Sequence, residues 1–254
     1  MPSAKLRSTT FLPSVFTSGN LFCGMLAIIE GTKGHTLNGA WLVVLASLFD
    51  GIDGMVARLT GHTSRFGVEF DSLSDVISFV LAPALLAYLL ALQPYGVWGI
   101  LATFCFAVTG TIRLARFNVS QKNLQEKGAF QGLPTPTTGG AVASYIIFCY
   151  RLSDGLCYPA LVPLFMVLLS LLMISQVKYP ALPKLAAKSF RSYVTYLVLL
   201  LAVIGIVLRP QYVLFPLVGC YILYGLARAP LLSLAAVVGS RRSRQHKIKA
   251  EGKA

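Results

Sequence analysis

Two neighbouring stretches place four aspartates inside an apolar sequence: DGIDGMVAR at residues 50–58 and GVEFDSLSD at residues 67–75. Apolar runs long enough to cross a bilayer precede the first stretch and follow the second. Carboxylates are costly in such runs, because an ionised group away from water needs a partner. The two stretches therefore predict a pair of membrane helices that carry a functional site.

The composition agrees with a membrane protein. Of the 254 residues, 56% are hydrophobic and only 12% are charged, and the mean hydropathy is +0.70. A soluble domain of this length needs a more polar surface. The formal net charge is +13, but the basic residues lie in short gaps between apolar runs and form no basic patch. We therefore expect no nucleic-acid partner.

The apolar runs predict an all-α, polytopic integral membrane protein with about eight transmembrane helices. The first run lacks a convincing small-residue cleavage site after it, so we expect it to be retained as a span. We place a transmembrane domain at residues 1–240 and a basic cytoplasmic tail at residues 241–254. The predicted helices lie at residues 13–30, 37–57, 66–92, 95–116, 137–150, 158–176, 193–208 and 212–238.

The basic residues predict the orientation of these helices. With eight spans, 19 of the 22 lysines and arginines are assigned to the side of the membrane that holds the termini and the loops after the second, fourth and sixth helices. Only Lys33, Arg151 and Arg209 fall on the other side. Because basic loops stay in the cytoplasm, we expect a multi-pass protein of the cell (inner) membrane with both termini cytoplasmic. The tail would lie against membrane lipids.

The spacing of the aspartates predicts that they converge. Asp50 and Asp53 are three residues apart and Asp71 and Asp75 are four apart, so each pair shares one helix face. In an antiparallel hairpin that turns near His62, Asp53 would meet Asp71, and Asp50 would meet Asp75 one turn deeper. Oxygen ligands of this kind favour Mg²⁺, Mn²⁺ or Ca²⁺. A chance cluster and a proton relay are the alternatives.

Glycines accompany the aspartates. Gly51 and Gly54 lie on the first helix of the hairpin, and Gly67 lies one turn before Asp71. Glycine in a membrane helix permits the close approach of another backbone or of a ligand. The sequence does not decide between these two roles.

The hairpin resembles the CDP-alcohol phosphatidyltransferases. Their signature, DxxDGxxAR followed by GxxxDxxxD, is matched at all eight fixed positions. Three further segments, at residues 11–24, 111–119 and 130–136, resemble the phosphatidylserine synthase (CDP-diacylglycerol–serine O-phosphatidyltransferase) branch. The resemblance fades over the last three predicted helices. Ser14 and Val80 depart from the usual pattern of the branch, and neither is a motif aspartate.

The resemblance implies a reaction. CDP-diacylglycerol would donate its phosphatidyl group to L-serine, giving phosphatidylserine and CMP. Asp50, Asp53 and Asp71 would bind Mg²⁺ or Mn²⁺. Asp75 would be both a metal ligand and the general base that takes the proton from the serine hydroxyl, which then attacks the β-phosphorus. The family also implies a homodimer.

Further residues are assigned to the two substrates. Residues expected at the CDP-lipid are Thr17, Asn20, Gly54, Ala57, Arg58 and Gly67. Residues expected at the acceptor are Arg113, Arg116 and Asn118. For Thr17 and Asn20, hydrogen bonds between helices are an equal alternative, and the two arginines can also serve only as positive-inside charges.

Other functions use parts of the same pattern. The same motif serves enzymes whose acceptor is glycerol 3-phosphate or inositol phosphate, and an ether-lipid donor of archaeal type is also open. The non-enzyme alternative is a cation transporter with acids inside the membrane. Such a transporter should carry inverted repeats with broken helices, and we find none in the sequence.

Overall fold

The computed structural model describes residues 5–60, 64–122, 132–153, 157–175, 177, 179 and 200–228, and all regular structure there is helical. The chain begins with a hairpin of α1 (Lys5–Thr32) and α2 (Thr36–Thr60). Gly34 turns the chain between them with φ of 88°, and Glu30 accepts a hydrogen bond from Lys33 at 3.0 Å. The helices predicted at residues 13–30 and 37–57 are confirmed, with extra turns at their ends.

The third helical run extends from Arg65 to Leu92 and confirms the helix predicted at residues 66–92. It begins at a cap, where Ser64 Oγ accepts the Gly67 N–H at 2.9 Å. Four segments follow one another without a break: α3 (Arg65–Asp75), the π-helix η1 (Val76–Leu81), α4 (Ala82–Ala87) and the π-helix η2 (Tyr88–Leu92).

The first π-helix has an identifiable cause. In η1 the Ala82 N–H bonds to the Ile77 carbonyl, five residues back. Pro83 follows in the first turn of α4 and has no N–H, so it cannot donate to the carbonyl of Phe79, four residues before it. The wide turn absorbs this interruption without ending the helix. π-helical turns of this kind are frequent at functional sites, and this one starts directly after Asp75.

The remaining helices complete the bundle. A short 3-10 turn, η3 (Gln93–Tyr95), leads into α5 (Val97–Lys122). After it come α6 (Thr135–Ser153), the 3-10 turn η4 (Pro159–Leu161) and α7 (Val162–Ile174). Residues 200–208 and 210–228 are also helical. The helices predicted at 95–116, 137–150 and 158–176 are confirmed, whereas parts of the last two predicted helices and the tail lie outside the described residues.

The described helices fit a membrane protein. Five are long and apolar enough to cross a bilayer, namely Val15–Thr32, Thr36–Leu59, Arg65–Tyr95, Val97–Val119 and Pro210–Arg228. A shorter apolar helix spans Pro159–Ile174. The all-α membrane fold is therefore confirmed, and the predicted number of eight spans stays a prediction.

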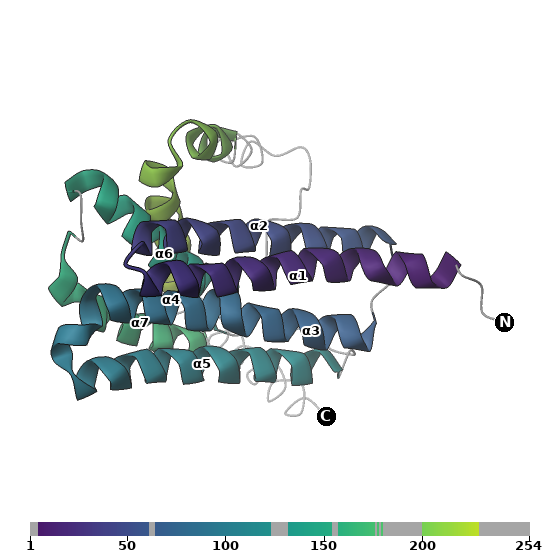
Figure 1. Ribbon diagram of the computed structural model, residues 1–254, viewed down its shortest axis with the longest axis horizontal. Helices are drawn as coiled ribbons and strands as arrows, with labels where there is room; N and C mark the ends of the chain where they lie inside the picture. The colour runs from purple at the N-terminus through teal and green to yellow at the C-terminus, as the bar shows by residue number, and fades with distance from the viewer. Residues whose placement is uncertain are drawn as a thin grey trace, which may run out of the picture.

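The first helices are aligned along the long axis of the molecule. In Figure 1, α1, α2, α3 and α5 run side by side, and α6 and α7 cover one end of this layer. The α1–α2 turn lies at the end near α6, while the end of α2 and the start of α3 lie at the opposite end, beside the N-terminal half of α1. The motif stretches therefore share one end of the bundle.

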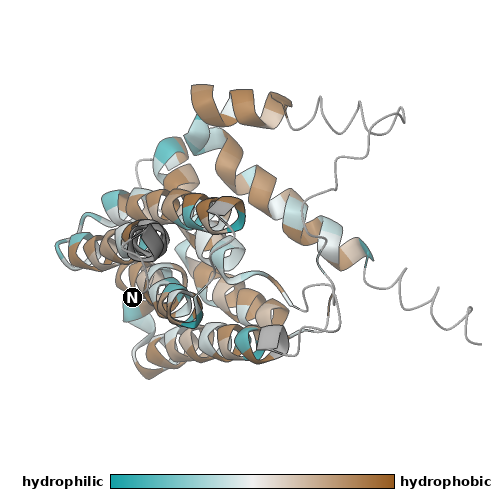
Figure 2. Cartoon of the chain, turned by 90° about the vertical axis from the view of Figure 1, so that its right-hand side faces the viewer, coloured by the Kyte–Doolittle hydropathy of each residue, from teal (hydrophilic) through white to brown (hydrophobic). Residues whose placement is uncertain are grey.

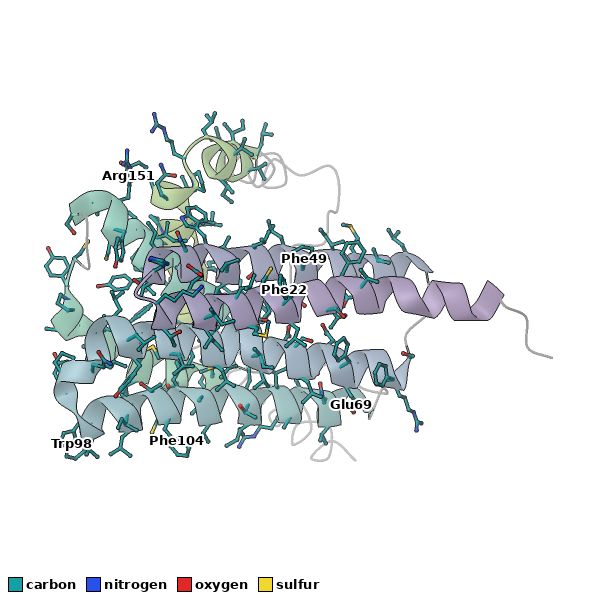
Figure 3. All side chains as sticks on the ribbon, viewed as in Figure 1. Phe22, Phe49, Glu69, Trp98, Phe104 and Arg151 are labelled. Carbon is teal, nitrogen blue, oxygen red and sulfur yellow. The ribbon has the colours of Figure 1, made fainter. Side chains whose placement is uncertain are left out.

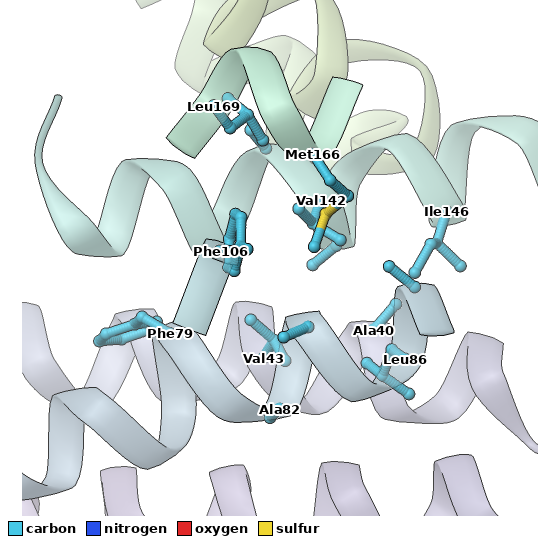
Figure 4. Close-up of a cluster of buried hydrophobic side chains, with 14 of the residues drawn as sticks. Ala40, Val43, Phe79, Ala82, Leu86, Phe106, Val142, Ile146, Met166 and Leu169 are labelled. Atoms are coloured by element: carbon cyan, nitrogen blue, oxygen red, sulfur yellow. The ribbon is translucent and has the colours of Figure 1, made fainter. Parts of the chain in front are cut away.

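The packed core extends from Ala40 of α2 to Phe79, one turn after Asp75. Figure 4 shows Val43 of α2, Leu86 of α4, Phe106 of α5 and Met166 of α7 meeting around α6. These four side chains are fully buried. Small residues let the backbones approach closely: a β-carbon added to Gly139 of α6 would lie 2.6 Å from the Phe79 carbonyl oxygen. Glycine is therefore required at this contact.

The outer surface is apolar. Trp98 and Phe104 point away from the bundle in Figure 3 and are 78% and 61% exposed, and Leu59 is 81% exposed. Figure 2 shows the same apolar colouring along the outer faces of the helices. Exposed apolar surface of this extent is unfavourable in water and favourable against lipid chains.

Candidate metal centre

Three of the four motif aspartates converge. Asp50 of α2 and Asp71 and Asp75 of α3 each offer one carboxylate oxygen, and these oxygens all lie within 4.8 Å of one another. Asp71 and Asp75 reach one place because they stand one helical turn apart. Asp50 reaches it because α2 and α3 run antiparallel. The predicted meeting of Asp50 with Asp75 is present, and Asp71 joins the same group.

Asp53 is placed differently. Its side chain is buried, with 6% exposed, and its Oδ2 accepts a hydrogen bond from the Thr17 hydroxyl of α1. It is still close enough to Asp71 for the two carboxylates to interact electrostatically. Asp53 therefore lines the same site from the α1 side, next to the group formed by Asp50, Asp71 and Asp75.

The donor set fits a hard divalent cation. All the converging ligand atoms are carboxylate oxygens, which Mg²⁺, Mn²⁺ and Ca²⁺ prefer. Asp71 Oδ1 is buried and has no hydrogen-bond partner within the described part of the chain. A buried charged oxygen without a partner is costly, and a cation bound to the three carboxylates would satisfy it.

Two residues of α1 reach into the site. Besides the bond from Thr17 to Asp53, Asn20 Nδ2 donates to Asp75 Oδ1 at 3.1 Å. Ser78 Oγ donates to the Asn20 carbonyl at 2.9 Å and so fixes the backbone of α1 against η1. Both expected CDP-lipid residues of α1 are therefore engaged in hydrogen bonds between helices.

The motif glycines of α2 face open space. A β-carbon built on Gly51 or Gly54 meets no atom of the described residues within 4 Å. Ala57 is half-buried and Arg58 is exposed at the end of the same helix. Close packing against another of the described helices therefore does not account for these two glycines. Gly67 differs, because its N–H donates to the Ser64 cap.

The expected acceptor residues of α5 separate into two environments. Arg113 is buried, with 8% exposed; one of its terminal nitrogens donates to Thr135 Oγ1, and Asp75 interacts with it electrostatically. Its Nε has no partner among the residues described. Arg116, three residues later, is exposed. Asn118 donates from Nδ2 to Ser72 Oγ at 2.9 Å, beside Asp71.

Sequence reasoning missed three residues of the site. Ser72 holds Asn118, Ser78 holds Asn20, and Thr135 accepts from Arg113. Ser72 and Ser78 stand next to or one turn after a motif aspartate, so their spacing is the signal that could have identified them. Thr135 lies in the segment at residues 130–136, where the resemblance was noted without a role for the hydroxyl.

Comparisons with known proteins agree on one family. The family model described as CDP-alcohol phosphatidyltransferase matches residues 10–201, which include every site residue above. A CDP-diacylglycerol–serine O-phosphatidyltransferase of Helicobacter pylori is 35% identical over 236 residues, 91% of this chain and 96% of the relative. The Bacillus subtilis protein of the same name is 35% identical over 181 residues, 70% of this chain and 94% of the relative. An archaetidylserine synthase of Methanothermobacter thermautotrophicus is 35% identical over 191 residues, 74% of this chain and 77% of the relative.

Proposed function

Because this chain belongs to the CDP-alcohol phosphatidyltransferase family, we propose that it transfers the phosphatidyl group of CDP-diacylglycerol to L-serine, giving phosphatidylserine and CMP. The chain is an enzyme, and the transporter alternative is set aside. The observation that carries the proposal is the convergence of Asp50, Asp71 and Asp75 at one point between α2 and α3.

The three converging carboxylates would hold the metal, with Asp53 beside them. A bound Mg²⁺ or Mn²⁺, with Ca²⁺ able to use the same oxygens, supplies positive charge that neutralises the diphosphate and stabilises the leaving phosphate. The protein contributes fixed carboxylate positions between two helices whose far ends are tightly packed. It also contributes a low-polarity surround, in which electrostatic attraction is stronger than in water.

Asp75 is our choice for the general base. It would take the proton from the serine hydroxyl while the serine oxygen forms a bond to the β-phosphorus. The bond between that phosphorus and the oxygen of CMP breaks, and CMP leaves with the electron pair. Asp75 is 8% exposed, and Asn20 donates to its Oδ1. This hydrogen bond leaves the second carboxylate oxygen for the proton.

The CDP-lipid would lie on the open face of α2. Space above Gly51 and Gly54 allows the nucleotide to approach the helix backbone. Ala57 extends this small-residue surface, and the exposed guanidinium of Arg58 is available to phosphate oxygens. Gly67 faces the same end of the bundle from the first turn of α3.

The acceptor, serine, would bind next to α5. Serine is a zwitterion. Its carboxylate needs a hydrogen-bond donor that is not already bonded to another group of the protein. The buried guanidinium of Arg113 offers Nε, which the described residues leave without a partner. Asn118 and Ser72 form a polar pair beside Asp71 that suits the ammonium group. Arg116 is exposed at the helix surface, where it can attract an anionic substrate.

Two related reactions are distinguished only by the substrate. Glycerol 3-phosphate or inositol phosphate as acceptor would use the same aspartates. An ether-lipid donor is the second candidate, and the observation that supports it is the 35% identity to a relative named archaetidylserine synthase. The motif itself would not discriminate between ester and ether chains, because we expect it to contact the nucleotide and the phosphates.

The surroundings of the site complete the proposal. We place the transmembrane domain at residues 1–240 and the basic tail at residues 241–254. The protein would lie in the cell membrane of a bacterium or archaeon as a dimer, with both termini in the cytoplasm. The motif end of the bundle would then face the cytosol, with Asp50 about 12 Å along α2 from Arg58.

The topology is tested by labelling at position 62. His62 lies outside the described residues. A cysteine at position 62 in a cysteine-free variant should react with impermeant reagents only after the inner face is exposed, and labelling of intact cells would reverse the topology.

The acceptor is tested by direct competition. Purified protein in detergent receives CDP-diacylglycerol and Mn²⁺ or Mg²⁺, with L-serine, glycerol 3-phosphate or inositol phosphate supplied separately, and CMP release is followed. We expect kcat/KM for serine to exceed that for either phosphorylated alcohol by at least about a hundredfold, as for a site built around a substrate's polar groups. A higher value for a phosphorylated alcohol would contradict the proposed acceptor and leave the family unaffected.

A further inference from the structure

We infer that Thr17 and Asn20 are positioning residues, which hold the carboxylates of Asp53 and Asp75 in place, and that they are not ligands of the CDP-lipid. The inference rests on the proposed function for the role of these carboxylates. It assigns to α1 a part in the reaction that the family motif, confined to α2 and α3, does not contain.

The geometry of α1 carries the inference. Thr17 and Asn20 are three residues apart and so lie on one face of the helix. They are 2% and 0% exposed. Thr17 donates to Asp53 of α2, and Asn20 donates to Asp75 of α3 at 3.1 Å. One face of α1 thus fixes one carboxylate from each helix of the motif hairpin.

Asn20 is itself held firmly. Its backbone carbonyl accepts from Ser78 Oγ at 2.9 Å. Ser78 is fully buried in the π-helix η1, which begins directly after Asp75. Gly24, one turn after Asn20, allows this contact, because a β-carbon there would lie 2.7 Å from Ser78 Cα. The direction of the Asn20 side chain is therefore set by backbone contact between α1 and η1.

Burial argues against direct binding of the CDP-lipid by these two residues. A ligand contact needs a polar atom that the substrate can reach. The Thr17 hydroxyl and one N–H of the Asn20 amide bond to carboxylates, and Asn20 Oδ1, which has no partner among the described residues, lies in a side chain that is 0% exposed. Groups that orient metal-binding side chains in this way typically change metal affinity or activity by about 10- to 100-fold when removed. Loss of a substrate contact would instead appear in KM.

The test compares two identical substitutions in α1 and α2. Thr17→Val removes the hydroxyl at the site. Thr36→Val removes a hydroxyl that is also buried, 5% exposed, and bonded across helices to Tyr150 at 2.9 Å, at the far end of α2. Mn²⁺ binding is measured by electron paramagnetic resonance, and CMP release gives kcat and KM for CDP-diacylglycerol.

We expect Thr17→Val to weaken Mn²⁺ binding about tenfold and to lower kcat about 10- to 100-fold, with KM for CDP-diacylglycerol changed by less than about twofold. Asn20→Leu, which keeps the branching at Cγ but has no polar atom, should behave likewise. Thr36→Val should show wild-type Mn²⁺ binding and kinetics, with a fall in Tm similar to that of Thr17→Val. Thr17→Ser, which restores the hydroxyl, should recover most of the lost Mn²⁺ affinity.

Three results would overturn the inference. The first is a raised KM for CDP-diacylglycerol with unchanged kcat and Mn²⁺ binding in Thr17→Val and Asn20→Leu. The second is a pattern in Thr17→Val that matches Thr36→Val in every readout. The third is Mn²⁺ binding by Thr17→Ser that is as weak as the binding by Asp71→Asn. This result decides the question if Thr17→Val and Asn20→Leu do not fold. Mn²⁺ binding needs no substrate, so a wild type that binds Mn²⁺ but ignores serine contradicts only the proposed function.

Discussion

The two ends of α2 differ in how they use small residues. At the end near α6, Gly39 would bring a β-carbon to 2.8 Å from the Ala27 carbonyl oxygen, and Ala40 and Ala46 are fully buried. At the motif end, Gly51 and Gly54 meet nothing of the described chain within 4 Å. The same residue type thus serves backbone packing at one end and leaves accessible surface at the other. The surroundings of a glycine, and not its presence, separate a packing role from a ligand role.

The two ends of the bundle also differ in whether their buried polar groups have hydrogen-bond partners. At the packed end, the buried Thr36 hydroxyl pairs with Tyr150. At the motif end, buried polar atoms of Asp71 and Arg113 remain without partners in the portion of the chain described. Unsatisfied buried groups are rare and costly, and they concentrate where a ligand completes them. The packed end therefore acts as a scaffold, and the motif end as a site that its substrates and metal complete.

The largest effect on activity is expected from the loss of a metal ligand at the motif end. Asp71→Asn removes one negative charge from the converging group but keeps its shape. Because charge stabilisation by a bound metal contributes several kcal/mol to the transition state, we expect CMP release to fall by about a thousandfold. The variant should retain its Tm within a few degrees. Wild-type turnover in Asp71→Asn, or undiminished turnover of the wild type in excess EDTA, would remove the metal centre from the account.

A smaller loss is expected at the acceptor side. Arg113→Gln removes a buried cation with an unsatisfied Nε, whereas Arg116→Gln changes an exposed one. Hydrogen bonds to charged groups contribute about 1.5–3 kcal/mol, so KM for serine should rise by about 10- to 100-fold in Arg113→Gln. The rise in Arg116→Gln should be about threefold or less, as for exposed charges. Equal effects of the two substitutions would show that burial does not mark the acceptor subsite.

Substitution of a motif glycine tests whether the open space above α2 binds substrate. Gly54→Ala places a methyl group in the open space above α2 and should raise KM for CDP-diacylglycerol by about tenfold, the effect of losing about 1.4 kcal/mol of binding. Its Tm should be unchanged or higher, because alanine favours the helix. A lower Tm with normal KM would mean that Gly54 is a packing residue after all.

The smallest effect on activity is expected at the contact between α6 and the π-helix η1, where no substrate-binding residue takes part. Gly139→Ala forces a β-carbon to 2.6 Å from the Phe79 carbonyl oxygen. Overpacking of this kind costs about 1–3 kcal/mol of stability, so Tm should fall by several degrees. In the folded fraction, KM for both substrates should stay within about twofold of wild type. A selective rise in either KM would link this contact to the site.

Much of this arrangement could be predicted from the sequence because it depends on local patterns. Apolar run lengths located the first six helices, including the one predicted at residues 137–150, which corresponds to α6. The four-residue spacing of Asp71 and Asp75 was enough to predict that they share a face, and the antiparallel hairpin brought Asp50 to them. These features follow from helix geometry alone.

Other features depend on contacts that local patterns do not encode. The π-helix after Asp75 arises where Pro83 and the close approach of Gly139 act on one carbonyl, that of Phe79. Asp53 bonds to Thr17 of α1, a contact that the hairpin pattern, which paired Asp53 with Asp71, does not encode. Arg113 and Arg116 are equivalent in sequence, but only Arg113 is buried, where it donates to Thr135 at the start of α6.

Anomalous diffraction from crystals grown with Mn²⁺ tests the central claim most directly. We predict a manganese peak at about 2.0–2.6 Å from carboxylate oxygens of Asp50, Asp71 and Asp75, the range of hard divalent cations. The peak should disappear in Asp71→Asn crystals grown under the same conditions. A wild-type structure with CDP-diacylglycerol bound and no metal peak among these three residues, or with the peak at another site, would contradict it.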